Sequence, residues 1–195
     1  MSKKQLKSDL KFLYKKGFRG LVTYTAQGNM VNAPKYAKAI GFKKVVAGIY
    51  ISQWNPPSGY GASTIVPKAR ALVAAGADAI VIGNEGVSTG RYTYTQLTNW
   101  VAEVKAAIPA TVQVTTSEPW ILYLNQGQPW QYPGLMTLGD FAFPNFHPFF
   151  DPASQWHAHP RNAALLLHNN WVQWFKGKTK PVILKETWWP SAMGN

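Results

Sequence analysis

The stretch ADAIVIGNE, residues 77 to 85, decides the fold class of this 195-residue chain. Its centre is an unbroken apolar run of isoleucine and valine, and it ends on an asparagine and a glutamate. A strand with one solvent-exposed face alternates apolar and polar residues, whereas an unbroken apolar run indicates a strand that is buried on both faces. Such strands belong to parallel sheets that are covered by helices.

The same pattern repeats along the chain on both sides of this stretch. Segments of helical period alternate with apolar, β-branched runs, and this alternation predicts an α/β fold with a parallel sheet, either a barrel or a doubly wound sheet. No glycine-rich phosphate-binding motif follows any strand, which weakens the nucleotide-binding version. The expected strands are FRGLVTYT (18–25), KVVAGIYIS (44–52), ADAIVIGNE (77–85), TVQVTTSEPW (111–120), FAFPNFHPFF (141–150) and 181–187, and the expected helices are 5–16, 33–40, 64–75, 93–108 and 161–175.

Length and composition narrow the class of protein further. The chain is long enough for one domain and too short for two large ones, so residues 1–195 are expected to form a single domain. There is no run of the roughly 18 to 20 apolar residues that a membrane span needs, and residues 1–30 lack the apolar core of a signal peptide. Cysteine is absent, which excludes disulfides and thiolate metal sites.

The net charge of +12 raises the question of a nucleic-acid partner. Many of the basic residues lie in the first helical segment, where lysines recur at a spacing of four opposite a set of leucines. This spacing is typical of the solvated face of an amphipathic helix, so no nucleic-acid partner is expected. The lysines are Lys3, Lys7 and Lys11, and the leucines are Leu6, Leu10 and Leu13.

The acidic residues fall into two groups. Asp9, Asp78, Glu103 and Asp140 have ordinary surface or capping explanations. The other four follow the ends of different predicted strands, and in a parallel barrel these ends converge on the face that carries catalytic groups. Paired carboxylates on such a face indicate acid/base and nucleophilic work on a glycosidic bond. These four residues are Glu85, Glu118, Asp151 and Glu186.

The tryptophans agree with a sugar-binding face. Core packing explains any single tryptophan, but six of the nine fall in loops that follow strands, where flat rings suit the apolar faces of pyranose rings. The six are Trp54, Trp120, Trp130, Trp156, Trp188 and Trp189. The pair His157 and His159 lacks the three or four convergent ligands of a zinc site, so neither a metal nor a cofactor is expected.

Four segments carry a resemblance to a known family. IVIGNEG (80–86) and VILKETWWPS (182–191) resemble the two signature segments of glycoside hydrolase family 17, the β-1,3-glucanase and glucanosyltransferase family of (β/α)8 TIM barrels. VTTSEPW (114–120) and FPNFHPFF (143–150) resemble the segments after its fifth and sixth strands. The resemblance implies a retaining enzyme that acts on β-1,3-glucan, and family members usually work outside the cytoplasm or at a cell wall.

The resemblance also implies roles for the two glutamates and their neighbour. Glu85 matches the acid/base and Glu186 the nucleophile, while Asn84 matches the residue that orients the sugar 2-hydroxyl. A retaining site needs its two carboxyls about 5 to 5.5 Å apart.

Further residues are expected to bind the substrate. By the same resemblance, His147 matches a position near the nucleophile and Tyr24 matches the aromatic at the end of the second strand. One or both of Trp188 and Trp189 are expected to form a wall of a glucose subsite. Trp120 is a further candidate on the same face. Glu118 either binds an acceptor hydroxyl or caps its loop, and Asp151 is better explained as a cap for the turn at Pro152.

Some features depart from the family pattern. Trp188 replaces a usual glycine, Val22 stands where an arginine is frequent, and Gly86 replaces a β-branched residue. The chain matches only the second to the seventh strand of the barrel, so we expect an incomplete barrel of about six βα units with open edges that favour self-association. An inactive carbohydrate-binding remnant of the same fold is the alternative.

Overall fold

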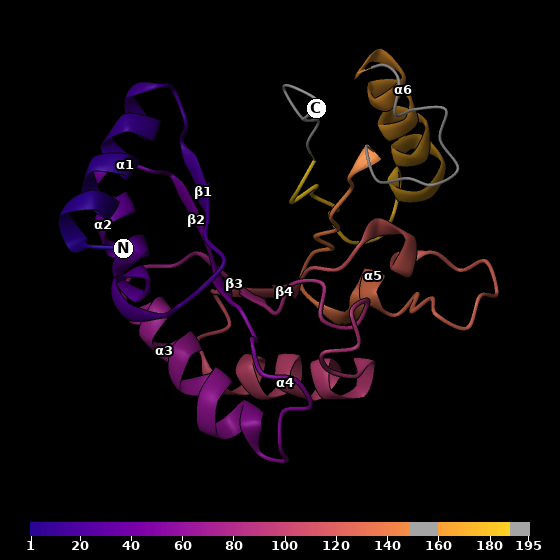
Figure 1. The fold of residues 1–195 in the computed structure, drawn as a ribbon, viewed down its shortest axis with the longest axis horizontal. Helices are drawn as coiled ribbons and strands as arrows, with labels where there is room; N and C mark the ends of the chain where they lie inside the picture. Colours follow the sequence, from indigo (N-terminus) through magenta and orange to yellow (C-terminus); the bar gives the residue numbers. More distant parts are fainter. Residues whose placement is uncertain (149–159, 188–195) are drawn as a thin grey trace, which may run out of the picture.

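The computed structural model describes residues 1–148 and 160–187, and its centre is a parallel sheet (Figure 1). Four strands lie in the order β1-β2-β3-β4 and every pair is parallel. The register aligns Val46 with Ala79, and Ala79 with Gln113. The strands are β1 (Gly20–Val22), β2 (Lys44–Ile49), β3 (Ala79–Ile82) and β4 (Gln113–Thr116).

Two further extended segments continue the sheet beyond β4. Segment 141–146 pairs on one side with Pro119, which follows β4, and on the other side with segment 181–186. All of these bridges are parallel. The pairing consists of isolated bridges because prolines at 119, 144 and 181 carry no N–H to donate. The chain therefore supplies the six parallel strand positions that its pattern predicts, the last two in this reduced form.

Helices follow the strands and cover the outside of the sheet (Figure 1). Their ends have local causes: Ser2 caps the first helix, the capping box of Thr93 and Gln96 opens the fourth, and left-handed Gly41 ends the second. The helices are α1 (Lys3–Lys15), α2 (Ala33–Ile40), α3 (Val66–Ala74), α4 (Tyr94–Ala107), α5 (Leu135–Leu138) and α6 (Pro160–Asn170). Short 3-10 or π turns cover Gly28–Asn32, Gly61–Ile65, Trp120–Tyr123 and Trp171–Phe175.

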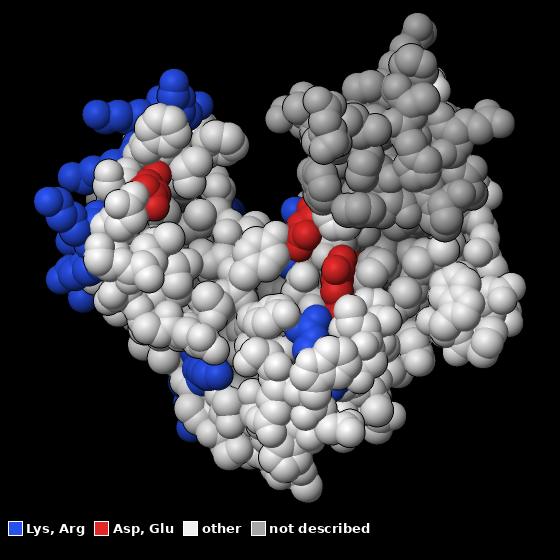
Figure 2. All heavy atoms as spheres, in the orientation of Figure 1, with Lys and Arg blue, Asp and Glu red and all other residues white. Residues whose placement is uncertain are grey.

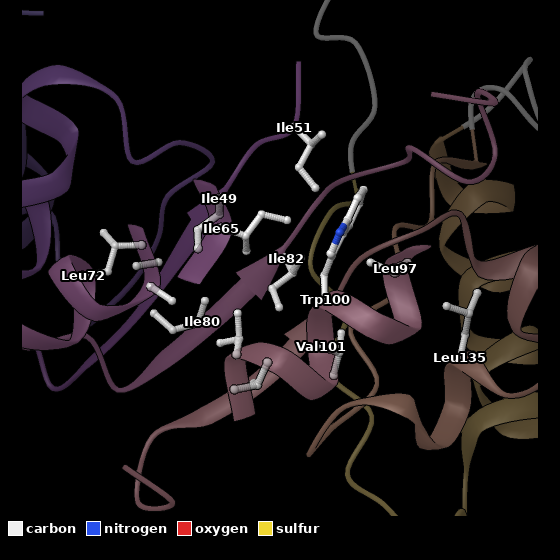
Figure 3. Packing of buried hydrophobic residues seen from close by; sticks show 14 of the residues in the cluster. Ile49, Ile51, Ile65, Leu72, Ile80, Ile82, Leu97, Trp100, Val101 and Leu135 are labelled. Carbon is white, nitrogen blue, oxygen red and sulfur yellow. The ribbon is translucent and has the colours of Figure 1, made fainter. Parts of the chain in front are cut away.

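The core lies on both faces of the sheet. Ile80 and Ile82 of β3 pack against the helices in the main cluster (Figure 3). Ala79 and Val81 of the same strand point to the opposite face, where Phe141 and Phe143 cover them. All of β3 is buried, which confirms the prediction from its unbroken apolar run.

The first helix confirms the amphipathic pattern of the sequence. Leu6 and Leu10 are buried against α2, and the lysines of α1 are exposed. Lys and Arg side chains gather over α1 and α2 on the outer side of the molecule (Figure 2). None of the helices in the described ranges combines the length and apolar character that crossing a bilayer requires.

Across ranges 1–148 and 160–187, the strands form an incomplete parallel barrel. Within the described residues, β1 is hydrogen-bonded to β2 alone and forms one edge of the sheet, and segment 181–186 forms the other. A cavity of about 340 Å³ lies inside and is lined by residues of both edges, including Val22 and Ile183. These two apolar side chains are 37% and 50% exposed, respectively, because no strand in the described residues covers them.

Candidate active site

The candidate site lies where the strands end, on the C-terminal face of the sheet. β3 leads to Asn84 and Glu85, β4 leads to Glu118, and segment 181–186 ends on Glu186. Acidic atoms are exposed at the base of the hollow in this face of the molecule (Figure 2). Parallel strands bring these residues together although a hundred positions separate the two glutamates.

His147 lies between the two glutamates. Its Nε2 atom is 3.3 Å from Glu186 Oε2 and 3.9 Å from Glu85 Oε1. The distance between Glu186 Oε2 and Glu85 Oε1 therefore cannot exceed the sum of these two distances. The separation of about 5 to 5.5 Å between the carboxyl groups of retaining glycosidases lies within this limit. Both carboxylates are partly exposed, so a substrate can reach them.

The backbone holds Glu85 in an unusual conformation. Its φ of 51° lies in the left-handed region, which residues other than glycine adopt only when surrounding contacts enforce it. The Glu85 N–H donates to the carbonyl of Ser117 at 2.9 Å, and the Glu85 carbonyl accepts from Ser88 and Thr89 hydroxyls and from Arg91. These contacts fix the direction in which the carboxylate leaves the chain.

Asn145 is a site residue that the sequence patterns did not single out. Its buried Nδ2 donates to Glu85 Oε1 at 2.8 Å and to Asn84 Oδ1 at 3.2 Å. The hydroxyl of Ser117 donates to its Oδ1 at 2.8 Å and so orients the amide. A polar residue inside the apolar segment FAFPNF was the available signal.

Lys185 was also missed. Its side chain is 2% exposed, and its ammonium donates to Glu186 Oε1 at 3.0 Å and to Asn84 Oδ1. Burial lowers the pKa of Lys185, and the neighbouring Glu186 opposes this shift. A cation directly before the glutamate of an apolar strand was the available signal.

Tyr24 joins the same group. The Lys185 ammonium lies 4.4 Å from the centre of its ring. Burial raises the pKa of Tyr24 well above its ordinary value, and a hydrogen bond and the charge of Glu186 raise it further. The structure thus brings together five of the predicted site residues: Tyr24, Asn84, Glu85, His147 and Glu186.

Glu118 was expected either to bind the substrate or to cap its loop, and its surroundings differ from those of the other predicted site residues. It is fully buried, and its carboxylate accepts hydrogen bonds from the backbone N–H groups of Gly86, Val87 and Ser88 at 3.0 to 3.1 Å. Burial raises the pKa of Glu118 to about 7, against the opposing effect of these hydrogen bonds. These contacts favour the capping alternative, in which Glu118 holds the loop after Glu85.

The tryptophans expected to bind sugar rings differ in how far they are exposed. Trp120 is partly buried and packs against Phe146 in a tilted arrangement with ring centres 4.8 Å apart, so packing accounts for part of its surface. Trp54 and Trp130 are exposed. Asp151, Trp156, His157, His159, Trp188 and Trp189 lie outside the described residues.

In ranges 1–148 and 160–187, no group of three or more acidic, histidine or cysteine side chains has the arrangement that holds a metal ion. The site is instead a carboxylate pair on two strand ends, surrounded by an amide, an imidazole and one buried ammonium. Such a pair at the C-terminal face of a parallel α/β barrel is the arrangement of a glycoside hydrolase.

Comparison with known proteins agrees with this class. The family model of the BtgE/BtgC glycoside hydrolase domain matches residues 1–195, so the chain belongs to this family. A probable β-glucosidase btgE of Emericella nidulans is 35% identical over 117 residues, which are 58% of this chain and 20% of that protein. Its counterpart in Aspergillus flavus is 27% identical over 98% of this chain and 30% of its own length. The chain thus spans less than a third of these relatives.

Solved structures confirm the fold. A β-1,3-glucanosyltransferase of glycoside hydrolase family 17 from Rhizomucor miehei superposes with a TM-score of 0.71 at 21% identity, covering 98% of this chain and 68% of that one. An active-site mutant of that enzyme in complex with laminaritriose matches equally well. The TIM-barrel fold expected from the sequence is thereby confirmed, with the barrel incomplete within the described residues, and the family model confirms the expected class of glycoside hydrolase.

Proposed function

We propose that this domain cleaves or transfers β-1,3-linked glucosyl units by a retaining, double-displacement mechanism. The observation that carries the proposal is the meeting of Glu85 and Glu186 at one imidazole, His147. The names of the relatives, a β-glucosidase and a β-1,3-glucanosyltransferase with bound laminaritriose, support a β-glucan substrate. Residues 1–195 act in this proposal as a single catalytic domain.

The surroundings of the two glutamates favour different roles for them. The Lys185 ammonium stabilises negative charge on Glu186, which suits the nucleophile. Glu85 instead receives a hydrogen bond from the neutral amide of Asn145, which suits a group that must gain and lose a proton. Asn84 has its Oδ1 occupied by Lys185 and Asn145, which leaves its Nδ2 to donate to the sugar 2-hydroxyl.

The reaction then follows in two steps. Glu186 attacks the anomeric carbon while the bond to the leaving oxygen breaks and Glu85 gives that oxygen its proton. In the second step Glu85 takes a proton from water or from a sugar hydroxyl, whose oxygen attacks the anomeric carbon and releases Glu186. Water gives hydrolysis and a sugar hydroxyl gives transfer, and Tyr24, Trp120, Trp188 and Trp189 are proposed to contact the sugar rings.

Replacing the nucleophile tests this mechanism. Glu186→Ala should abolish turnover of laminari-oligosaccharides, and added azide should restore reaction with an aryl β-glucoside and give the glycosyl azide of inverted configuration. Glu85→Gln should lose activity on unactivated glucan by roughly 100-fold or more, because general acid catalysis is removed. Binding of laminari-oligosaccharides by the unaltered chain without any product would contradict the proposal.

We also propose that copies of the domain associate through the open edges of the sheet. Val22 borders both the interior cavity and a second apolar cavity of about 380 Å³ between β1 and α1. An apolar edge strand of this kind tends to pair with another chain.

A further inference from the structure

The buried carboxylate of Glu118 has no part in the proposed reaction, yet it lies directly beneath the loop that carries Glu85. Glu118 Oε1 accepts from the N–H groups of Gly86 and Val87, and Oε2 accepts from that of Ser88. Three consecutive backbone donors therefore converge on one side chain from a different strand. A fully buried carboxylate is unfavourable unless such donors satisfy it, so the loop and Glu118 depend on each other.

The same strand end also holds Glu85 itself. The carbonyl of Ser117, one residue before Glu118, accepts the Glu85 N–H at 2.9 Å, and the Ser117 hydroxyl orients the Asn145 amide that donates to the Glu85 carboxylate. Two neighbouring residues after β4 thus fix the backbone and, through Asn145, the side chain of the acid/base.

Tyr92 packs closely against the same loop. A Cβ at Gly86 would overlap the Tyr92 ring, so this side of the loop has no room for a side chain. Gly86 is therefore held both by the ring of Tyr92 and by the Glu118 carboxylate. The neighbouring residue, Glu85, has a left-handed φ, which a residue other than glycine keeps only where the surrounding contacts enforce it.

We propose that Glu118 is a positioning residue for the proton-transferring group Glu85: its carboxylate anchors the amides of residues 86–88 and so sets the direction of the Glu85 side chain. The inference rests on the proposed function, because it concerns the acid/base of that reaction. Glu118 does not touch the sugar, and its effect is confined to steps that need a correctly aimed proton donor or acceptor.

This role predicts a dependence on the leaving group. Glu118→Gln keeps the shape of the side chain but places an amide NH2 group against the N–H donors of the loop. Above about pH 7, where the folded chain holds Glu118 as a carboxylate, the kcat/KM for a laminari-oligosaccharide, whose leaving hydroxyl needs a proton, should fall by about 10- to 100-fold. The kcat/KM for 2,4-dinitrophenyl β-glucoside, whose leaving group needs no proton, should fall by less than about threefold.

Asp78→Asn provides the matched control. Asp78 is also a carboxylate that accepts a backbone N–H, from Val45 at 2.7 Å, but it lies at the start of β3, away from the site. This variant should lower Tm without changing the ratio of the two kcat/KM values. Glu118→Asp is a second test in case Glu118→Gln does not fold, because it keeps the charge but draws it back from the loop.

The outcomes separate the inference from the proposed function. A changed ratio in a folded Glu118 variant, with the wild-type ratio in Asp78→Asn, supports the positioning role. Equal losses on both substrates, or no loss, overturn the positioning role while leaving the enzyme activity established. Failure of the unaltered chain to turn over either substrate overturns the proposed function and the positioning role with it.

Discussion

Lys185 is the side chain that gives the two glutamates unequal surroundings. Its ammonium is buried and donates to Glu186 and Asn84, while Glu85 interacts with the Asn145 amide. A buried ammonium is retained in the charged form only next to such acceptors, so Lys185 and Glu186 stabilise each other's charges. The proposed nucleophile therefore lies beside a cation, whereas the proposed acid/base lies beside a neutral amide.

Replacing Lys185 with methionine should slow the formation of the glycosyl-enzyme. Without the ammonium, Glu186 loses a hydrogen bond and the cation beside it, and the Asn84 side chain loses one of the two donors that orient it. The kcat/KM for an aryl β-glucoside should therefore fall by roughly 10-fold or more. Lys105→Met, which removes a cation paired with Asp140 away from the site, should leave kcat/KM unchanged. Equal kcat/KM values in the two variants would contradict the role of Lys185.

Glu118 predicts a dependence of stability on pH. Burial raises the pKa of Glu118 to about 7 from its ordinary value of 4.5, so the folded chain holds this proton more tightly than the unfolded chain does. Its contribution to the free energy of unfolding is therefore largest below about pH 4.5, declines as the pH rises towards 7 and is constant above. Between about pH 5 and pH 8, the Tm of the wild type should therefore fall more than that of Glu118→Gln. If the two Tm curves run parallel over this range, the raised pKa of Glu118 is contradicted. Asp78 and Asp140 have lowered pKa values, so they change protonation below this window.

The sequence predicted where the two proposed reacting residues lie better than it predicted the residues that contact them. Glu85 and Glu186 could be placed because the ends of parallel strands converge whatever the details of their pairing. Asn145 and Lys185 could not, because their contacts depend on segment 141–146 lying between Glu118 and Glu186 in one particular register. Glu118 was ambiguous for a related reason, since its position after a strand fits both an open and a buried carboxylate.

At the level of elements, helices matched their predicted ranges because caps and glycines determine their ends. The opening of α4 at its capping box and the end of α2 at Gly41 are local in origin. The strands are shorter than the apolar runs that predicted them. In segments 141–146 and 181–186 prolines interrupt the hydrogen bonding, and in 18–25 only Gly20–Val22 pairs with β2 as a strand.

The loop from β3 to α4 explains the glycine that departs from the family pattern. A side chain at position 86 would overlap the ring of Tyr92, which itself packs edge-on against Trp100 of α4. Gly86→Ala should therefore lower the stability by about 1 to 3 kcal/mol through overpacking, and it should also lower kcat by displacing Glu85. Thermal unfolding and turnover measure the two effects. Gly20→Ala is the control, since a Cβ there meets open space, and equal losses in both variants would contradict this explanation.

At the level of the whole molecule, the parallel barrel could be predicted from the order of its strands, but its exposed surface depends on which strands are neighbours. Val22 and Ile183 belong to apolar runs that suggest burial, and both are exposed because they lie at the two edges of the sheet. Net charge acts against association of these edges, since each copy carries +12. The balance between apolar attraction and charge repulsion therefore depends on salt.

This balance gives a test of self-association. Raising the salt concentration from about 0.05 M to about 0.5 M screens the repulsion between copies, so sedimentation velocity should show association that increases with salt and with protein concentration. Val22→Lys places a charge on the edge strand β1 and should shift the distribution towards the monomer. Val172→Lys adds the same charge at an exposed position in the turn after α6 and should have little effect. If the wild type stays monomeric at high salt, or if both variants act alike, the open edges are not the surfaces through which copies associate.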